Sequence, residues 1–193
     1  MKNLTLSVIV PFFNEKKYLK SSVERLISVS IFKEIILVDD NSTDNSYSIA
    51  ENLAHNVDNI QVLKNKVGKG KGAAVEYAKN HLTSTHMIIH DADLEYFPSD
   101  IVEMFDLAKN NPEVLILGTR FNGNKSRKNI YVRTELANRF LSFFFSVINL
   151  YKISDIASCY KMMPTEFFKE NKFSEKGFAY DIEILSKYLK HNK

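Results

Sequence analysis

Short apolar runs alternate along the chain with longer amphipathic segments. The apolar runs are rich in β-branched residues and have little polar alternation, which is typical of strands buried on both faces of a sheet. They cover residues 6–10, 34–38, 60–63, 87–89 and 114–117. Between them, apolar residues recur at helical spacing over residues 19–30, 49–56 and 101–108. Strands that alternate with helices predict an α/β fold with a mostly parallel sheet flanked by helices.

The composition is that of a folded globular protein, with 45% hydrophobic and 25% charged residues. A length of 193 residues can form one sizeable core, and no repeat or linker marks a boundary, so we expect a single domain over residues 1–193. The formal charge of +3 is too small to indicate nucleic acid as a partner. Cys159 is the only cysteine, which excludes an internal disulfide and fits the reducing cytoplasm.

Three acidic residues follow the apolar run 87–89 at every second position. In an extended chain, the carboxylates of Asp91, Asp93 and Glu95 therefore point the same way. Mg²⁺ and Mn²⁺ prefer such oxygen ligands, and Mg²⁺ commonly completes its shell with water and substrate phosphates. The pattern predicts a metal site that carries a diphosphate, although a solvated acidic turn is the alternative. We assign no role to His90 beside it, because a histidine at a strand end is more often a packing residue.

Polar residues also follow the first two apolar runs, at residues 11–15 and 39–44. Ligands of a parallel sheet bind beyond the carboxyl ends of its strands, so these segments belong to the expected ligand edge. Ser42 or Thr43 could cap the next helix, which explains part of the second segment. Capping does not explain the adjacent carboxylates of Asp39 and Asp40, which would repel the other acidic residues of this edge without a cation or donors between them.

A loop rich in glycine and lysine covers residues 66–74. Its glycines allow close approach of a ligand to the backbone, and its lysines supply positive charge near the start of a helix, so phosphate is the expected ligand. The loop also fits the dinucleotide pattern G-x-G-x-x-A, with Asp93 about twenty positions on. Against that alternative, the dinucleotide motif normally opens the first crossover of its domain, whereas this loop follows the third strand.

Taken in order, these segments resemble the motifs of family 2 glycosyltransferases, which have the GT-A fold with a Rossmann-like, mostly parallel sheet. The matching segments are residues 8–15, 34–44, 68–74 and 91–95. Residues 118–121, 137–140, 155–161 and 177–183 resemble the subgroup that includes dolichol-phosphate mannosyltransferase and bacterial polyprenyl-phosphate glycosyltransferases. The resemblance implies inverting transfer of a sugar from a GDP- or UDP-sugar to dolichyl or undecaprenyl phosphate, with Mg²⁺ or Mn²⁺ as cofactor.

The resemblance also implies roles for individual residues. The nucleoside would be lined by Pro11, Phe13 and Glu15, with Asp39 reading the base and Asp40 near the ribose or the sugar. Lys69 or Lys71 would neutralise the phosphates. The metal would be held by Asp91, Asp93 and Glu95, although glutamine is also common in the family at the last position. Positive charge at the metal would then stabilise the departing diphosphate, which makes Asp93 a catalytic residue.

The nature of the acceptor decides which further residues matter. A lipid phosphate is largely ionised at pH 7 and needs no strong base, and the resemblance implies that Arg120 and Arg133 clamp it. If the acceptor is a glycan hydroxyl in cell-surface polysaccharide synthesis, a base is required, and Asp155 is the candidate. The alternative for Asp155 is a turn or cap residue after Ser154. A nucleotide-sugar-binding protein without catalysis is the remaining alternative.

Residues 140–151 form an apolar, aromatic segment that is too short to span a bilayer, which takes about 20 residues. Basic residues precede this segment, at positions 125, 127, 128, 133 and 139. Basic and aromatic residues together favour a helix that lies on an anionic membrane surface, so we expect the protein in the cytoplasm or on the cytoplasmic face of a membrane. A helix that packs in the core is the alternative. The sequence leaves the oligomeric state open, and also whether the chain continues beyond Lys193.

Overall fold

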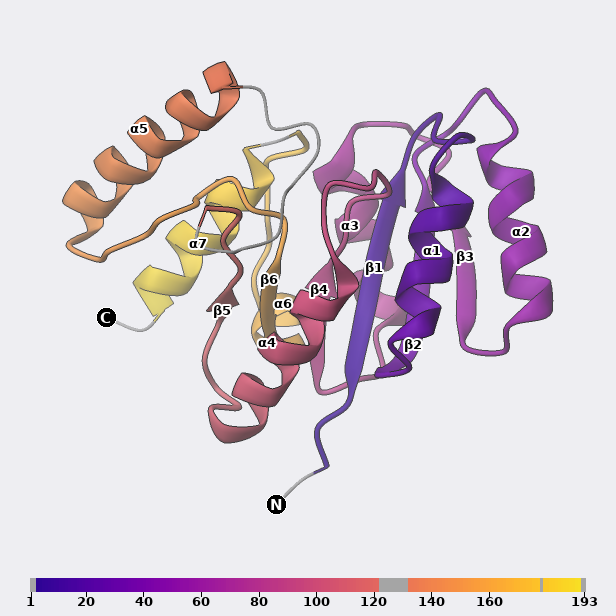
Figure 1. The fold of residues 1–193 in the computed structure, drawn as a ribbon, viewed down its shortest axis with the longest axis horizontal. Helices are drawn as coiled ribbons and strands as arrows, with labels where there is room; N and C mark the ends of the chain where they lie inside the picture. Colours follow the sequence, from indigo (N-terminus) through magenta and orange to yellow (C-terminus); the bar gives the residue numbers. More distant parts are fainter. Residues whose placement is uncertain (1–2, 122–131, 178, 192–193) are drawn as a thin grey trace.

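The computed structural model describes residues 3–121, 132–177 and 179–191, and for residues 132–134 it describes the backbone alone. These residues form a six-stranded sheet with the strand order β3-β2-β1-β4-β6-β5 (Figure 1). The strands are β1 (Leu6–Phe12), β2 (Phe32–Asp39), β3 (Ile60–Lys64), β4 (His86–Ile89), β5 (Ile116–Leu117) and β6 (Lys161–Pro164). The neighbours β3, β2, β1 and β4 are parallel, which confirms the predicted mostly parallel sheet.

The last two strands of the sheet depart from the prediction. Strand β6 pairs antiparallel with both β4 and β5, and it begins at Lys161, a charged residue that interrupts the apolar pattern. The segment 114–117 was expected to be another buried parallel strand, but only Ile116 and Leu117 are in β5, half-buried at the edge of the sheet. The C-terminal half of the chain therefore completes the sheet by antiparallel pairing.

Two cores lie on the two faces of this sheet. Along β1, Val8 and Val10 belong to one core and Ile9 to the other, because successive side chains of a strand alternate between faces. The first core is covered by α1 (Leu19–Ser28), α2 (Ser46–Asn56) and α4 (Pro98–Asn110). The second is covered by α3 (Lys71–Ala78), α6 (Thr165–Glu170) and α7 (Tyr180–His191), with the short 3-10 helix η1 (Lys79–His81) after α3.

The ends of the helices agree with local rules. Helix α4 starts with Pro98, whose fixed φ suits the first position of a helix and whose missing N–H needs no partner there. Helix α1 ends at Ser28, two residues before the predicted end, and Ser30 then adopts the left-handed region with φ 52°. A long helix, α5 (Val132–Asn149), lies at the margin of the molecule (Figure 1).

Candidate functional site

A pocket of about 670 Å³ lies at the carboxyl edge of the sheet. Its walls come from the loops that follow β1, β2 and β4, together with the glycine-rich loop before α3. Seven of the residues predicted from the sequence line it, namely Pro11, Phe13, Glu15, Asp40, Lys71, Asp91 and Asp93. Gly177, which the sequence analysis placed in a motif without a role, also contributes to the wall. The fold thus brings together residues that are up to 166 positions apart in the sequence, from Pro11 to Gly177.

Two of the three predicted metal ligands are paired with basic side chains. The Lys71 ammonium lies 2.9 Å from Asp91 Oδ1, and Arg120 Nη1 lies 3.0 Å from Glu95 Oε1. Asp93 makes no ion pair with any described residue, and its Oδ1 accepts a hydrogen bond from the Glu95 N–H at 3.0 Å. Burial, together with the neighbouring carboxylates of Asp91 and Glu95, raises the pKa of Asp93.

The predicted set of three carboxylate ligands is therefore not assembled. Across the described ranges, no group of three or more His, Cys, Asp or Glu side chains is placed to hold a metal ion. Glu95 is drawn to Arg120, whereas Asp91 and Asp93 line the same pocket. Positive charge added between Asp91 and Asp93 would relieve the repulsion that raises the pKa of Asp93, so this pair of carboxylates fits a divalent cation.

Lys71 is the first residue of α3 and belongs to a chain of alternating charges. Its Nζ lies 3.0 Å from Asp181 Oδ2, and Asp181 Oδ1 in turn lies 3.3 Å from Nζ of the fully buried Lys161. Burial by itself lowers the pKa of Lys71, but the two carboxylates of Asp91 and Asp181 outweigh it and raise the pKa above its ordinary value. Lys161 also donates to the Ser158 carbonyl oxygen. The sequence analysis missed this chain of charges. A lysine next to apolar strand residues, such as Lys161 in β6, could have indicated a buried ion pair.

The structure separates the two lysines of the glycine-rich loop. Lys69 has an exposed side chain outside this pocket, while Lys71 lines it. The loop itself is held by Asp40, whose Oδ2 accepts from the Gly70 N–H at 2.7 Å and whose Oδ1 accepts from Asn65 Nδ2 at 2.8 Å. Gly70 has φ 97°, and a Cβ there would lie 2.8 Å from the Lys176 carbonyl oxygen, so only glycine fits. Asp40, predicted to lie near the ribose or sugar, thus has a second task in shaping the loop.

Asp39, the residue predicted to read the base, is fully buried at the end of β2. Its Oδ1 accepts a hydrogen bond from the Ser42 N–H at 3.0 Å, but its Oδ2 has no partner among the described residues. Asp39 is not itself among the residues that line the pocket, whereas its neighbours Asp40 and Asn41 are. A buried acceptor without a donor is costly, and this oxygen is therefore suited to take an N–H group from a ligand.

Arg120 is held in place by Asp155. Its Nε and Nη2 donate to the two oxygens of Asp155 at 2.9 Å, and its backbone N–H donates to Oδ2 at 2.9 Å. Asn138 on α5 donates to Asp155 Oδ1 as well, at 2.5 Å. Burial alone would raise the pKa of Asp155, but these donors outweigh it and lower the pKa.

Asp155 therefore does not suit the role of a base, which is a correction to the sequence-based interpretation. The residue is fully buried, its oxygens accept from Arg120 and Asn138, and a lowered pKa makes it a poor proton acceptor. The alternative role of Asp155 as a local cap does not fit either, because its main side-chain partner, Arg120, is 35 residues away in the sequence. Asp155 instead positions Arg120. Arg133, the other predicted phosphate clamp, has its side chain outside the described residues.

Comparison with known proteins decides the family. The family model described as Glycosyl transferase family 2 matches residues 7–171, which include all of the predicted site residues. The chain belongs to glycosyl transferase family 2. This membership confirms the resemblance that the ordered motifs indicated.

Named relatives are similar to this family 2 chain over different lengths. The UDP-N-acetylglucosamine–dolichyl-phosphate N-acetylglucosaminyltransferase of Methanococcus voltae is 27% identical over 173 residues, covering 82% of this chain and 68% of that protein. The dolichol-phosphate mannosyltransferase of Mycosarcoma maydis is 34% identical over 123 residues, covering 60% of this chain and 42% of that protein. This chain therefore spans about two thirds of the first relative and less than half of the second.

A solved structure confirms the fold. Glucosyl-3-phosphoglycerate synthase from Mycobacterium tuberculosis, in complex with Mn²⁺, UDP and glucosyl-3-phosphoglycerate, matches with a TM-score of 0.75 at 17% identity. The match covers 98% of this chain and 66% of the synthase chain. The GT-A fold predicted from the sequence motifs is thus confirmed for this family 2 chain, including the part after residue 171 that the family model does not reach.

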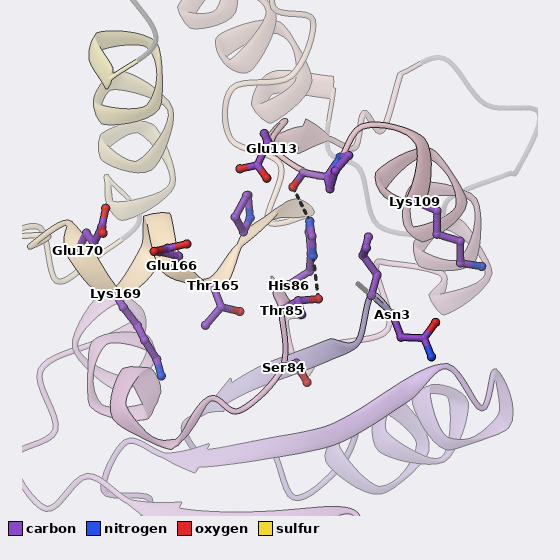
Figure 2. Close-up of a pocket in the computed structure, with 13 residues that line it drawn as sticks. Asn3, Ser84, Thr85, His86, Lys109, Glu113, Thr165, Glu166, Lys169 and Glu170 are labelled. Atoms are coloured by element: carbon purple, nitrogen blue, oxygen red, sulfur yellow. Dashed lines mark hydrogen bonds between the residues drawn. The ribbon is translucent and has the colours of Figure 1, made fainter. Parts of the chain in front are cut away.

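A larger cavity, of about 800 Å³, lies at the opposite, amino edge of the sheet (Figure 2). None of the predicted site residues lines it. At its centre, His86 is buried, with Nε2 bonded to the Pro112 carbonyl oxygen at 2.8 Å and Nδ1 to Thr85 Oγ1 at 3.1 Å (Figure 2). Burial lowers the pKa of His86, so the ring is neutral at pH 7. The candidate site of this family 2 chain is therefore chosen by its chemistry and not by cavity size.

His90, to which the sequence analysis gave no role, is a structural residue. It is buried, and its Nε2 and Nδ1 are bonded to Ser22 Oγ at 3.0 Å and to Tyr160 OH at 2.9 Å. Burial lowers the pKa of His90 to about 4, so it remains neutral beside the acidic residues of this family 2 chain.

Helix α5 presents most of its apolar side chains outward, although Phe145 packs against the second core. Phe143 is 63% exposed and Ile148 is 76% exposed, while Asn138 and Ser142 on the other side are buried. Ser142 Oγ accepts from the Ile156 N–H at 3.0 Å, so polar side chains attach the helix to the protein. The exposure of these side chains argues against a helix that packs wholly in the core. Nowhere in the described part of the chain is a helix both long and apolar enough to pass through a membrane.

Proposed function

We propose that this chain transfers a sugar, with inversion, from a GDP- or UDP-sugar to a polyprenyl phosphate such as dolichyl or undecaprenyl phosphate, with Mg²⁺ or Mn²⁺ as cofactor. The observation that carries this proposal is the convergence of Phe13, Lys71, Asp91 and Asp93 on one pocket at the carboxyl edge. An aromatic ring, a cation and two carboxylates are the groups that a nucleoside diphosphate with a bound metal requires. The names of the relatives supply the acceptor class.

The donor nucleotide finds a partner for each of its parts in this pocket. Phe13 is more than half exposed and can pack against the base. The resemblance implies that Asp39 accepts an N–H from the base, which both uracil and guanine offer, but Asp39 is buried outside the pocket lining, so this contact requires its neighbours Asp40 and Asn41 to shift. Glu15 lines the pocket and can accept from ribose hydroxyls. The diphosphate then lies toward Lys71 and the acidic pair.

The reaction places new negative charge on the departing diphosphate. A divalent cation bound at Asp91 and Asp93 would supply positive charge there, which stabilises the transition state more than the ground state. Lys71 adds a second positive charge in the same pocket. Asp93 remains ionised in this role, because the added cation lowers the pKa that its neighbours raise.

The acceptor phosphate is matched by Arg120. Asp155 and Glu95 fix the guanidinium, and the remaining N–H groups of Nη1 and Nη2 can donate to a phosphate oxygen. A lipid phosphate is already ionised at pH 7, so its oxygen attacks the anomeric carbon without a base. The rival acceptor, a glycan hydroxyl, would need a base, and Asp155 is engaged elsewhere. This difference favours the lipid phosphate.

The outward face of α5 supports attachment to the membrane that carries such an acceptor. Exposed apolar side chains of this size are unusual on a water-facing helix, and they suit insertion among lipid headgroups. Arg139 is exposed on the same helix, although it also pairs with Glu135 at 2.8 Å. We propose that α5 lies in the surface of an anionic membrane on its cytoplasmic face.

The test is a turnover assay with a panel of UDP- and GDP-sugars, each with undecaprenyl or dolichyl phosphate and with Mg²⁺, Mn²⁺ or a chelator. The proposal expects release of the nucleoside diphosphate only when both the lipid phosphate and a divalent cation are present. Turnover with a glycan hydroxyl and not with a lipid phosphate would contradict the acceptor. Metal-dependent donor binding without turnover on any acceptor would favour the non-catalytic alternative.

A further inference from the structure

The acidic residues of the pocket carry their own basic partners. Lys71 occupies the carboxylate of Asp91, with Nζ 2.9 Å from Oδ1 and 3.2 Å from Oδ2, so it contacts both oxygens. Asp91 makes no other ion pair with a described residue. The Lys71 ammonium group thus already occupies the position that a divalent cation would take at the Asp91 carboxylate.

A second carboxylate, from a distant part of the chain, holds this ammonium in place. Asp181 at the start of α7 lies 3.0 Å from Lys71 Nζ, and it also pairs with the buried Lys161. The two carboxylates differ in the cationic partners that they would keep if Lys71 moved away. Asp181 keeps a positive partner in Lys161, whereas Asp91 would then have no cationic partner among the described residues. The fold therefore allows Lys71 to move away from Asp91 without leaving Asp181 uncompensated.

From this arrangement we infer that Lys71 is an internal counterion of Asp91, which competes with the divalent cation for that carboxylate and transfers to the diphosphate when metal and nucleotide bind together. The inference rests on the proposed donor site. Two cations at one carboxylate repel each other unless an anion lies between them, and the diphosphate provides that anion. Metal and nucleotide should therefore bind with positive coupling. The diphosphate draws Lys71 away from Asp91 and so frees this carboxylate for the metal. The metal in turn displaces Lys71, which can then pair with the diphosphate.

The inference is tested by titration calorimetry of Lys71→Met, which keeps a side chain of similar length but removes the charge. We expect this variant to bind Mn²⁺ alone about tenfold more tightly than the wild type, since one opposite charge at this distance changes the affinity of a carboxylate for a cation by that order. In saturating Mn²⁺ we expect the opposite effect on nucleotide. UDP or GDP, whichever the wild type prefers, should bind about tenfold more weakly because one phosphate partner is lost.

Lys69→Met is the matched control, because Lys69 lies two residues away in the same loop with an exposed side chain outside the pocket. Both affinities of this variant should stay within about twofold of the wild type. Lys71→Gln is a second uncharged variant, for use if Lys71→Met does not melt cooperatively.

The outcomes distinguish this inference from the proposed function. If the wild type binds Mn²⁺ and nucleotide but neither uncharged variant gains Mn²⁺ affinity, the counterion role is wrong and the donor site stands. If Mn²⁺ binds only after Lys71 is replaced, the competition is supported. If neither the wild type nor the Lys71 variants bind Mn²⁺, both the proposed function and the counterion role are overturned.

Discussion

The two edges of the sheet differ in the kind of polar group that they leave without a partner. At the carboxyl edge, among the described residues, these are Asp39 Oδ2, which has no donor, and the carboxylate of Asp93, which accepts from the Glu95 N–H but has no cationic partner. At the amino edge, they are the buried hydroxyls of Ser84 and Thr165, which face the larger cavity (Figure 2). An unpaired charge costs several kcal/mol when buried, whereas a neutral hydroxyl costs about 1–3 kcal/mol. Uncompensated charge is thus a better guide to the functional site than the volume of a cavity.

The largest effect expected from this comparison is the loss of activity on changing Asp93 to Asn. Removal of this carboxylate weakens the hold on the divalent cation, and loss of such electrostatic stabilisation lowers turnover by about 100- to 1000-fold. Steady-state release of the nucleoside diphosphate measures it. Thr165→Ala at the amino edge is the control and should stay within about twofold. Equal losses in the two variants would remove the distinction between the edges.

A second large effect concerns stability and the pair of Arg120 with Asp155. In Asp155→Asn the half-buried guanidinium loses a bidentate partner, and breaking a buried pair in this way lowers the free energy of unfolding by about 3 kcal/mol. Urea denaturation measures the change. Asp106→Asn breaks an exposed pair with Lys109 and should cost less than about 0.5 kcal/mol. A similar small cost for Asp155→Asn would show that the buried pair does not hold this part of the site.

The same carboxylate predicts a pH dependence of stability. Because the folded pKa of Asp155 is lowered, its contribution is fully present above the unfolded pKa of about 4 and is lost as the pH falls through the folded pKa. The wild type should therefore lose free energy of unfolding more steeply below about pH 4 than Asp155→Asn does. Parallel curves for the two proteins would contradict the assigned cause of the lowered pKa.

An intermediate effect is expected at the outward face of α5. Replacing Phe143 and Phe144 by Ser removes two exposed aromatic rings, and co-sedimentation with anionic liposomes should weaken by at least about tenfold. Leu107→Ser, an equally exposed apolar change on α4, should leave binding unchanged. If wild-type protein binds no vesicle, or if the Leu107 variant loses as much binding, α5 is not the membrane contact.

The smallest effect is expected for Glu95→Gln. The amide oxygen can still accept from Arg120 Nη1, and Glu95 faces Arg120 rather than the other acidic residues. Turnover should change by less than about fivefold. A loss as large as that of Asp93→Asn would show that the charge of Glu95 is needed at the metal, as the sequence pattern first suggested.

The parts of the fold that follow local rules were predictable from the sequence. The alternation of Val8, Ile9 and Val10 between two cores gives β1 directly, and the polar residues after each parallel strand mark the ligand edge. The antiparallel pairing of strand β6 was harder to predict, because the local pattern around Lys161 does not encode which strands it joins. The choice between Lys69 and Lys71 also needed the fold, since both are loop lysines in the sequence and only Lys71 reaches the pocket.

The remaining features could not be predicted from the sequence, because they depend on contacts between residues that are far apart along the chain. Asp155 meets Arg120 across 35 residues, and Lys71 meets Asp181 across 110, so neither pair leaves a periodic signal. The exposed face of α5 could be predicted only as one of two alternatives, because an apolar helix suits a core and a membrane surface equally well. The inward position of Asn138 and Ser142 distinguishes them, and it depends on hydrogen bonds to residues 155–157.

The most direct test is an NMR titration of Mn²⁺ into isotope-labelled protein saturated with its preferred nucleoside diphosphate. Paramagnetic broadening locates the ion, because it falls steeply with distance. The account predicts that the amide signals of residues 91–93 and of Lys71 broaden first, while those of Ser84 and Thr165 at the other edge broaden last. Broadening that begins at the amino edge, or that shows no preference between the edges, would contradict a cation held by Asp91 and Asp93.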